Sequence, residues 1–240
     1  MKFLKGIVVL GKIKQIIKNK IFETFPLSYV FMFHHVTDCP EIKRSSLLGF
    51  EQFKDFVLAF DGCYTHLFEI ATKKVKGKIA ITFDDGLEDL YTLAYPFLRE
   101  HNIPFTAFIV TDFLDKEGYI TTEQLKEMSK DPLVTIGSHG VSHIIFPKLS
   151  TENKKNELIE SQKILQEIIG KDITFFAYSH GQYDKETLSM MNCYDYAFKA
   201  GSSLWDCLKH NRYFLPRFNI GANTVDKQRD FFERVALKRS

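Results

Sequence analysis

The stretch Lys78-Ile79-Ala80-Ile81-Thr82-Phe83-Asp84-Asp85-Gly86 decides the fold. A short apolar run that ends at a glycine turn predicts a buried strand. Parallel α/β proteins gather their chemistry at the carboxyl ends of such strands, where Asp84 and Asp85 stand. Neighbouring strand residues point to opposite faces, so the two carboxylates are expected to differ in role unless the chain already turns there. A solvated turn is the alternative, because Asp-Asp-Gly is common in loops.

Similar apolar runs recur along the chain and alternate with amphipathic segments. Strands are predicted at residues 29–36, 78–86, 105–110, 133–139, 173–178, 196–200 and 213–217. Helices are predicted at residues 50–60, 87–100, 121–128, 150–169, 184–191 and 225–237. Alternation of this kind predicts parallel strands joined by right-handed crossovers. With 240 residues and no linker, the chain is expected to form one barrel-like α/β domain.

The longest predicted helix begins at Ser150 and stops at Gly170, which are residue types that cap helices at these ends. One face carries an apolar stripe and the other carries lysine and glutamate. We interpret the charged face as solvated. The apolar stripe consists of Leu158, Leu165, Ile168 and Ile169.

Composition limits the classes of partner. The net charge is only +2, which argues against a nucleic-acid partner. Residues 1–20 nevertheless contain six lysines and no acid, interleaved with apolar residues. We therefore interpret residues 1–25 as a basic amphipathic segment that either contacts a membrane surface or packs on the domain. The segment is a poor match to a signal peptide, and the four cysteines form no disulfide framework, which favours a cytoplasmic or membrane-surface location.

A second group of ionisable residues, His139-Gly140-Val141-Ser142-His143, follows the strand predicted at 133–139. Two histidines four residues apart can present both imidazoles to one metal ion, from a helical turn or across a loop. Such a pair also occurs by chance in cores and on surfaces. Together with a carboxylate from the Asp84-Asp85 strand end, the histidines would make a three-ligand site with open positions, as in hydrolytic metal centres.

Three motifs in this order resemble the polysaccharide deacetylase family, which is the NodB-homology fold of carbohydrate esterase family 4. The motifs are Thr82-Phe83-Asp84-Asp85-Gly86, Ser138-His139-Gly140-Val141-Ser142-His143 and Phe176-Ala177-Tyr178-Ser179-His180-Gly181-Gln182-Tyr183-Asp184. The similarity covers roughly residues 78–200. It implies a single domain at residues 26–240 with a distorted (β/α)7-type barrel, in agreement with the alternation of strands and helices.

Carried over position by position, the resemblance implies that Asp84 is the catalytic base. It implies that Asp85, His139 and His143 hold a divalent metal ion. Zinc suits two imidazoles and one carboxylate, although other divalent ions do so too. A metal ion polarises the acetamide carbonyl and lowers the pKa of bound water, and a free carboxylate beside it can take the proton of that water.

The third motif implies further roles and departs from the family pattern. The resemblance assigns the oxyanion-stabilising backbone N–H to His180 and a substrate contact to Tyr178. Ser179 stands in place of the usual proline, which is expected to loosen the loop. The side chain of His180, where the family often has an aromatic residue, is interpreted as a surface histidine or a substrate contact. The family's base-orienting arginine is missing before this motif, and Arg217 is the best substitute.

The leaving amine must be protonated, and the chain after Arg217 contains no histidine to do so. In a subgroup that acts on poly-N-acetylglucosamine, the motifs are circularly rearranged and the acid histidine comes early in the chain. Phe33-His34-His35-Val36 resembles that early motif, with His34 in the place of the acid and His35 pointing away. A histidine titrates near neutral pH, which suits this role.

The function expected from these motifs is metal-dependent removal of N-acetyl groups from an N-acetylated oligo- or polysaccharide. One alternative is an amidase of the same fold that acts on a non-sugar amide. Another is a carbohydrate-binding relative without turnover, which the changes in the third motif would favour. The motifs indicate neither the particular sugar nor the oligomeric state.

Overall fold

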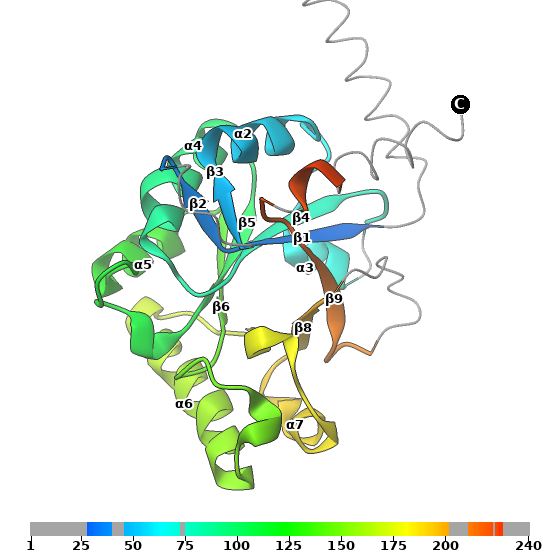
Figure 1. Cartoon of the computed structure of the whole chain (residues 1–240). Coiled ribbons are helices and arrows are strands. Elements are labelled where there is room, and N and C mark those ends of the chain that lie inside the picture. Colours follow the sequence, from blue (N-terminus) through cyan, green and yellow to red (C-terminus); the bar gives the residue numbers. More distant parts are fainter. Residues whose placement is uncertain (1–27, 40–45, 73–74, 202–210, 223, 228–240) are drawn as a thin grey trace, which may run out of the picture.

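The computed structural model describes residues 28–39, 46–72, 75–201, 211–222 and 224–227. In this part of the chain, seven strands form a closed barrel in the order β1-β4-β5-β6-β7-β8-β9, and every pairing is parallel (Figure 1). The predicted single-domain (β/α)7-type barrel is thereby confirmed. The barrel strands are β1 (Tyr29–Phe33), β4 (Ile79–Phe83), β5 (Phe105–Ile109), β6 (Val134–Ser138), β7 (Phe175–Ala177), β8 (Tyr196–Ala200) and β9 (Leu215–Asn219).

Helices follow most barrel strands, and α2, α4, α5 and α6 lie around the outside of the barrel (Figure 1). A small parallel sheet, β2 (His35–Thr37) with β3 (Leu47–Gly49), lies beside them. The α-helices are α2 (Phe50–Leu58), α3 (Leu67–Ala71), α4 (Tyr95–Glu100), α5 (Thr122–Lys130), α6 (Thr151–Ile169) and α7 (Lys185–Ser189). The shorter turns are the π-helix η1 (Leu90–Ala94) and the 3₁₀ turns η2 (Thr111–Phe113), η3 (Phe146–Lys148), η4 (Ser179–Gly181) and η5 (Met191–Cys193).

The inside of the barrel holds its own apolar cluster. Residues of six different strands, among them Val30, Phe108 and Phe198, pack there with side chains of α3. Side chains from strands on opposite sides of a closed barrel can contact each other only across its interior. Because side chains of α3 pack with this interior cluster, α3 must cover one open end of the barrel. Because α3 precedes β4 in the chain, that end is the amino end of the strands. The carboxyl ends are therefore left for the polar residues.

A larger cluster fills the space between strands and outer helices, and it is rich in phenylalanine. Phe33 of β1 and Phe53 of α2 meet edge-on with ring centroids 5.2 Å apart, and Phe33 stacks on Phe83 of β4 at 5.5 Å. Burying one such side chain stabilises the fold by roughly 1.5–3 kcal/mol. In β4, Ile79, Ile81 and Phe83 face this outer layer, whereas Ala80 faces the interior, as the period of two requires.

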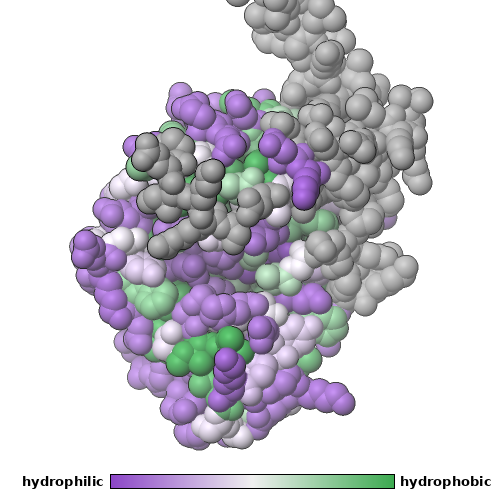
Figure 2. All heavy atoms as spheres, viewed as in Figure 1, coloured by the Kyte–Doolittle hydropathy of each residue, from purple (hydrophilic) through white to green (hydrophobic). Residues whose placement is uncertain are grey.

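The surface of the described residues is mostly hydrophilic in the view of Figure 2, with small hydrophobic patches, of which the most strongly coloured lies in the lower part of the view near α6. The large apolar side chains exposed among the described residues are Leu58, Phe68, Ile144 and Ile159. No helix among the described residues is long and apolar enough to cross a membrane. The basic segment at residues 1–25 lies outside the described residues.

Several predicted elements differ in detail. The strand predicted at 29–36 is interrupted at His34, because the chain leaves the barrel after Phe33 and continues as β2. The helix predicted at 87–100 contains the π-helix η1 before α4. The helix α3 and the strand β3 were not expected from periodicity, and the predicted strand at 29–36 covers the first two residues of β2. A helical segment starts at Val225 as predicted, and its continuation beyond residue 227 lies outside the described residues.

Candidate metal-centred active site

The site begins with the turn that follows β4. The strand ends at Phe83, and the backbone turns left-handed at Asp85 (φ 74°) and Gly86 (φ 76°). A non-glycine residue with positive φ is uncommon and costs backbone energy. This turn lets the side chains of Asp84 and Asp85 serve the same end of the barrel, although neighbouring strand residues would point apart. A Cβ at Gly86 would lie 3.2 Å from the side chain of Ile109, so the turn is also tightly packed.

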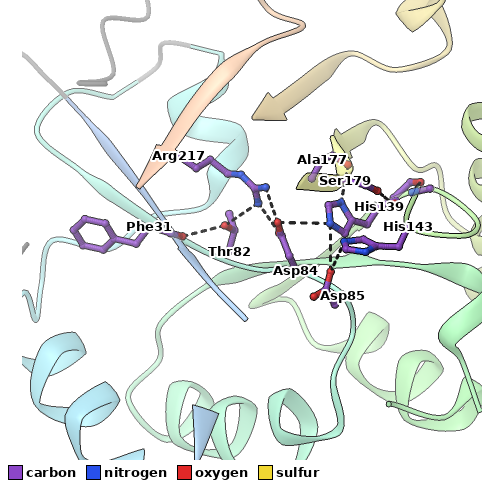
Figure 3. A network of polar contacts seen from close by, with 11 residues as sticks. Phe31, Thr82, Asp84, Asp85, His139, His143, Ala177, Ser179 and Arg217 are labelled. Atoms are coloured by element: carbon purple, nitrogen blue, oxygen red, sulfur yellow. Dashed lines mark hydrogen bonds and ion pairs between the residues drawn. The ribbon is translucent and has the colours of Figure 1, made fainter. Parts of the chain in front are cut away.

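Asp84 is fully embedded and paired with Arg217 of β9. Both terminal nitrogens of Arg217 donate to its carboxylate, Nη1 to Oδ1 at 2.6 Å and Nη2 to Oδ2 at 2.7 Å (Figure 3). Nη1 also donates to the hydroxyl of Thr82 at 3.2 Å, and that hydroxyl donates to the carbonyl of Phe31 at 3.0 Å. Asp84 is 3% exposed and Arg217 is 0% exposed. A two-point bond of this kind fixes both the charge and the orientation of the carboxylate.

Arg217 also sets the protonation of Asp84. Burial alone would raise the pKa of this carboxyl, but the positive charges of Arg217 and His139 outweigh burial and hold its pKa below the usual range. Asp84 is therefore an ionised carboxylate at neutral pH. The guanidinium lies over the ring of Phe108, 5.0 Å from its centroid, which confines Arg217 to this position inside the barrel.

Among the described residues, one group of histidine and carboxylate side chains could hold a metal ion, and it consists of Asp85, His139 and His143. One ligand atom from each lies within 4.8 Å of the others. Oδ1 of Asp85 is 3.4 Å from Nε2 of His139 and 3.2 Å from Nε2 of His143 (Figure 3). This oxygen is buried and makes no hydrogen bond among the described residues. Three potential ligand atoms that converge around a buried carboxylate oxygen fit a divalent cation.

His139 is oriented by its second ring nitrogen. Nδ1 is 2.7 Å from the carbonyl of Ala177, which can only accept, so Nδ1 carries the proton and Nε2 is the atom that faces Asp85. A metal-binding histidine is commonly fixed in this way. Its backbone is held as well, because His139 N–H donates to the carbonyl of Ile109 at 2.8 Å and Ser179 Oγ donates to its carbonyl at 3.1 Å. Burial opposes a charge on His139, but Asp84 and Asp85 outweigh it and raise the pKa of His139, so the site favours positive charge.

His143 is presented by a loop and is more exposed, at 23% of its side chain. Its backbone is left-handed, with φ 59°. Its ring contacts that of His139 at 5.1 Å between centroids and that of His180 at 4.6 Å. His180, also left-handed at φ 56°, is exposed beside the metal-ligand group. The backbone N–H of His180, which is expected to stabilise the oxyanion, belongs to the turn η4 that follows the end of β7.

His34 and His35 separate at the end of β1. His34 is half-buried and its Nδ1 is buried without a hydrogen-bond partner among the described residues. Burial lowers the pKa of His34, while the charges of Asp84 and Asp85 act in the opposite direction, and the result is a lowered pKa. His34 therefore lies within electrostatic range of the carboxylates of the site. His35 instead turns to Asp89, with Nδ1 2.8 Å from Oδ2, which agrees with the expectation that it points away.

Two residues of the third motif behave differently from expectation. Tyr178 is 1% exposed, and its hydroxyl donates to the carbonyl of Tyr213 at 2.7 Å, so its side chain belongs to the core and not to a substrate surface. Ser179 is fully buried, and its hydroxyl bond to the carbonyl of His139 ties the third motif to the second. A proline could not make this bond. Replacement of proline by serine was expected to loosen this loop, but the serine hydroxyl bonds the carbonyl of His139 and holds the loop in place.

Helix α6 supplies residues that sequence reasoning missed. Its charged face was interpreted as solvated, but Lys154 is 2% exposed and Glu157 is 7% exposed. Lys154 Nζ donates to Asp184 at 2.7 Å and to Glu186 at 2.6 Å, which joins α6 to the end of the third motif. Glu157 contacts the loop between His139 and His143. Burial of a lysine and a glutamate depends on partners far away in the chain, which helical periodicity does not reveal.

Known proteins resemble this chain in sequence or in fold. YxkH of Bacillus subtilis (strain 168) is 32% identical over 110 residues, which are 46% of this chain and 39% of YxkH. The poly-β-1,6-N-acetyl-D-glucosamine N-deacetylase of Staphylococcus aureus (strain MSSA476) is 29% identical over 212 residues, covering 78% of this chain and 71% of that protein. The deacetylase PplD of Streptococcus pyogenes, solved in complex with acetate, is 20% identical with a TM-score of 0.76 and shares the fold over 84% of this chain and 95% of its own.

The family model described as polysaccharide deacetylase matches residues 71–198, which is 128 of the 240 residues and so more than half of the chain. The matched region contains the turn after β4, the two histidines four residues apart and the third motif. His34 and Arg217 lie outside it. The chain belongs to the polysaccharide deacetylase family.

Proposed function

We propose that this protein is a metal-dependent hydrolase that removes N-acetyl groups from an N-acetylated oligo- or polysaccharide. The observation that carries the proposal is a buried, arginine-paired carboxylate beside three convergent ligand atoms. Asp84 Oδ2 lies 3.8 Å from Nε2 of His139, so the expected base and the expected ligands form one centre. A protein that only binds carbohydrate has no need of an ionised carboxylate beside a metal site.

The metal ion would be held by Asp85, His139 and His143. The buried Oδ1 of Asp85, which faces both imidazoles and accepts no hydrogen bond among the described residues, and the orientation of His139 by Ala177 fit a divalent cation, with zinc favoured by the mixed imidazole and carboxylate set. When bound, such an ion polarises a carbonyl and lowers the pKa of a bound water. These ligands leave Asp84 outside the set, because both of its oxygens are engaged by Arg217.

The chain's own residues divide the remaining work. Asp84 accepts a proton from the water that attacks the acetamide carbonyl, and Arg217 holds its carboxylate in place. The backbone N–H of His180 stabilises the oxyanion that forms. His34 protonates the amide nitrogen as the carbon–nitrogen bond breaks, so the products are acetate and the free amine. A histidine whose pKa is lowered is a stronger acid once it carries a proton.

The substrate we propose is a polymer of N-acetylglucosamine. Support comes from the 212-residue similarity to a poly-β-1,6-N-acetyl-D-glucosamine N-deacetylase, which extends beyond the region of the family model. The early position of His34 is a second support, since this is the place of the acid histidine in the rearranged subgroup. Circular rearrangement of the motifs is part of the same proposal.

The proposal is tested by measuring acetate release from β-1,6-linked N-acetylglucosamine oligomers with zinc, and again after chelation. We expect release that chelator abolishes and added zinc restores. Chitin oligomers, which carry β-1,4 linkages, serve as the matched substrate control. Release from a simple non-sugar acetamide alone would favour an amidase, and sugar binding without release from any oligomer would favour a binding protein.

A further inference from the structure

Glu157 of α6 engages the loop that separates the two metal-ligand histidines. Its Oε2 accepts the backbone N–H of Val141 at 2.7 Å and that of Ser142 at 3.1 Å, and the hydroxyl of Ser142 donates to Oε1. The carboxylate is 7% exposed, so these bonds are formed largely away from water. Charge-assisted bonds to backbone N–H groups are among the stronger hydrogen bonds in proteins.

The other side of the same loop is held by backbone bonds. Thr111 N–H donates to the carbonyl of Gly140 at 3.2 Å, and Asp112 N–H donates to that of Val141 at 2.9 Å. The carbonyls of Gly140 and Val141 thus accept bonds from η2 after β5, and the N–H groups of Val141 and Ser142 donate to the side chain of Glu157. No strand or helix supplies these N–H groups with a partner, since residues 139–145 form no regular element.

The loop needs such support because its backbone is unusual. Gly140 has φ 85° and His143 has φ 59°, so a left-handed residue stands at either end of the bonds to Glu157. A left-handed histidine persists only where the surrounding structure enforces it. A Cβ at Gly140 would lie 2.8 Å from Oε2 of Glu157, so the carboxylate occupies the space that a side chain there would need.

The two histidines differ in how much they depend on this loop. His139 is fixed independently by Ile109, Ala177 and Ser179. His143 follows the loop directly, one residue after Ser142. A movement of the Val141–Ser142 segment would therefore displace His143 more than His139.

We infer that Glu157 is a positioning residue that holds His143 in the conformation that presents its Nε2 to the metal site. This inference rests on the metal site of the proposed function. It adds a role for α6, whose Ser161 shares the same buried face and lies 2.7 Å from Ser138 at the end of β6, between their hydroxyl oxygens. The carboxylate thus acts on metal affinity through a ligand and without touching the metal.

The test is zinc affinity of the purified full chain, measured by competition with a chromophoric chelator. Glu157→Gln keeps the size of the side chain and removes its charge. We expect zinc to bind ~10–100-fold more weakly, the usual effect of losing a partner that orients a ligand. Glu160→Gln, one turn along on the exposed face of α6, makes the same charge change and should bind zinc as the wild type does.

A second readout separates positioning from general loosening. With cobalt in place of zinc, the visible absorption of Glu157→Gln should change shape, because the ligand geometry changes, whereas that of Glu160→Gln should not. Ser142→Ala removes only the hydroxyl that donates to Glu157 and should destabilise the fold less than Glu157→Gln does. It should therefore weaken zinc binding by a smaller factor than Glu157→Gln. Wild-type affinity and cobalt spectrum in folded Glu157→Gln, or in Ser142→Ala if the first variant does not fold, would overturn the inference. Metal binding is measured without acetate release, so failure of the proposed activity would be seen separately.

Discussion

The candidate site has two halves that are built in different ways. Asp84, His139 and Arg217 stand on barrel strands or at their ends and are no more than 3% exposed. His143 and His180 stand on loops, with left-handed backbones and partly exposed rings. The strand half is fixed by the ladder of the closed barrel and by packing around it. The loop half has no ladder and is held by single side chains from other elements.

This difference suggests that the strand half carries out proton transfer and that the loop half sets how tightly a metal ion is bound. The carboxylate expected to move protons is buried where its orientation and charge cannot drift. His143, an expected metal ligand, stands on a loop whose Val141 and Ser142 N–H groups bond the side chain of Glu157. Substitutions in the strand half should therefore change turnover. Substitutions of the residues that support the loop half should change metal binding or stability.

The largest effect is expected from Asp84→Asn, which removes the base from the strand half. Acetate release should fall by at least ~10⁴-fold, the upper end of the range for general base catalysis. Zinc content should stay near that of the wild type, because the ligands are untouched. Zinc content is measured by elemental analysis beside the acetate assay. Loss of zinc from this variant would mean that Asp84 and Asp85 have exchanged roles.

His34→Ala tests whether the acid comes from the end of β1. The rate should fall ~10²–10⁴-fold, the usual contribution of a general acid, and zinc binding should not change. His35→Ala is the matched control, because His35 bonds Asp89 and faces away from the centre. A normal rate for His34→Ala together with an inactive His35→Ala would move the role by one residue.

Arg217→Lys tests whether orientation of the base matters beyond its charge. Lysine keeps the positive charge but cannot make the two parallel bonds of a guanidinium. We expect kcat to fall ~10–100-fold with little change in KM, because the carboxylate is misaligned while substrate contacts persist. Arg217→Met would in addition leave Asp84 buried without a partner and destabilise the fold by roughly 3–5 kcal/mol. Equal kcat in Arg217→Lys and wild type would remove the positioning role from this arginine.

The smallest effect is expected where α6 supports the third motif. Lys154→Met should lower Tm by roughly 2–6 °C, whereas Lys155→Met on the exposed face should not. The hydrogen bond from Lys154 lowers the pKa of Asp184 to about 2. This pairing therefore stabilises the fold fully at pH values above the ordinary pKa of a carboxyl group, and the stabilisation is lost as the pH falls toward 2. The difference in Tm between wild type and Lys154→Met should therefore narrow in acid. A constant difference from neutral pH down to the acid range would contradict this account.

Much of the fold could be predicted because its signals are local. The strand at Tyr196–Ala200 was located residue for residue, and α6 begins after Ser150 and ends before Gly170 as expected. Apolar runs and caps are properties of neighbouring residues, so they survive without tertiary knowledge. The small elements β3 and α3 were not predicted, because their stability comes from what they pack against.

The site was predictable only in part for the same reason. Asp85 lies in one short motif and His139 and His143 lie in another, and the structure brings the two motifs together. The burial of Tyr178 and the contacts of Glu157 depend on elements distant in the chain, and no local pattern indicates them. Tyr178 resembled a substrate contact because of its place in a motif, but its side chain packs in the core.

The order of strands and helices, and the residues that follow three strand ends, can be predicted from the chain alone, because hydrophobic periodicity and short motifs involve residues that are close in sequence. Which distant groups meet at those strand ends depends on how the whole chain folds. Arg217 stands 133 positions after Asp84, and closure of β9 against β1 brings the two strands together. Glu157 lies on a charged helix face that would be expected to be solvated. The residue is buried because α6 packs against the loop between His139 and His143. Pairing across a closed barrel depends on the whole chain, and so does the geometry of this site.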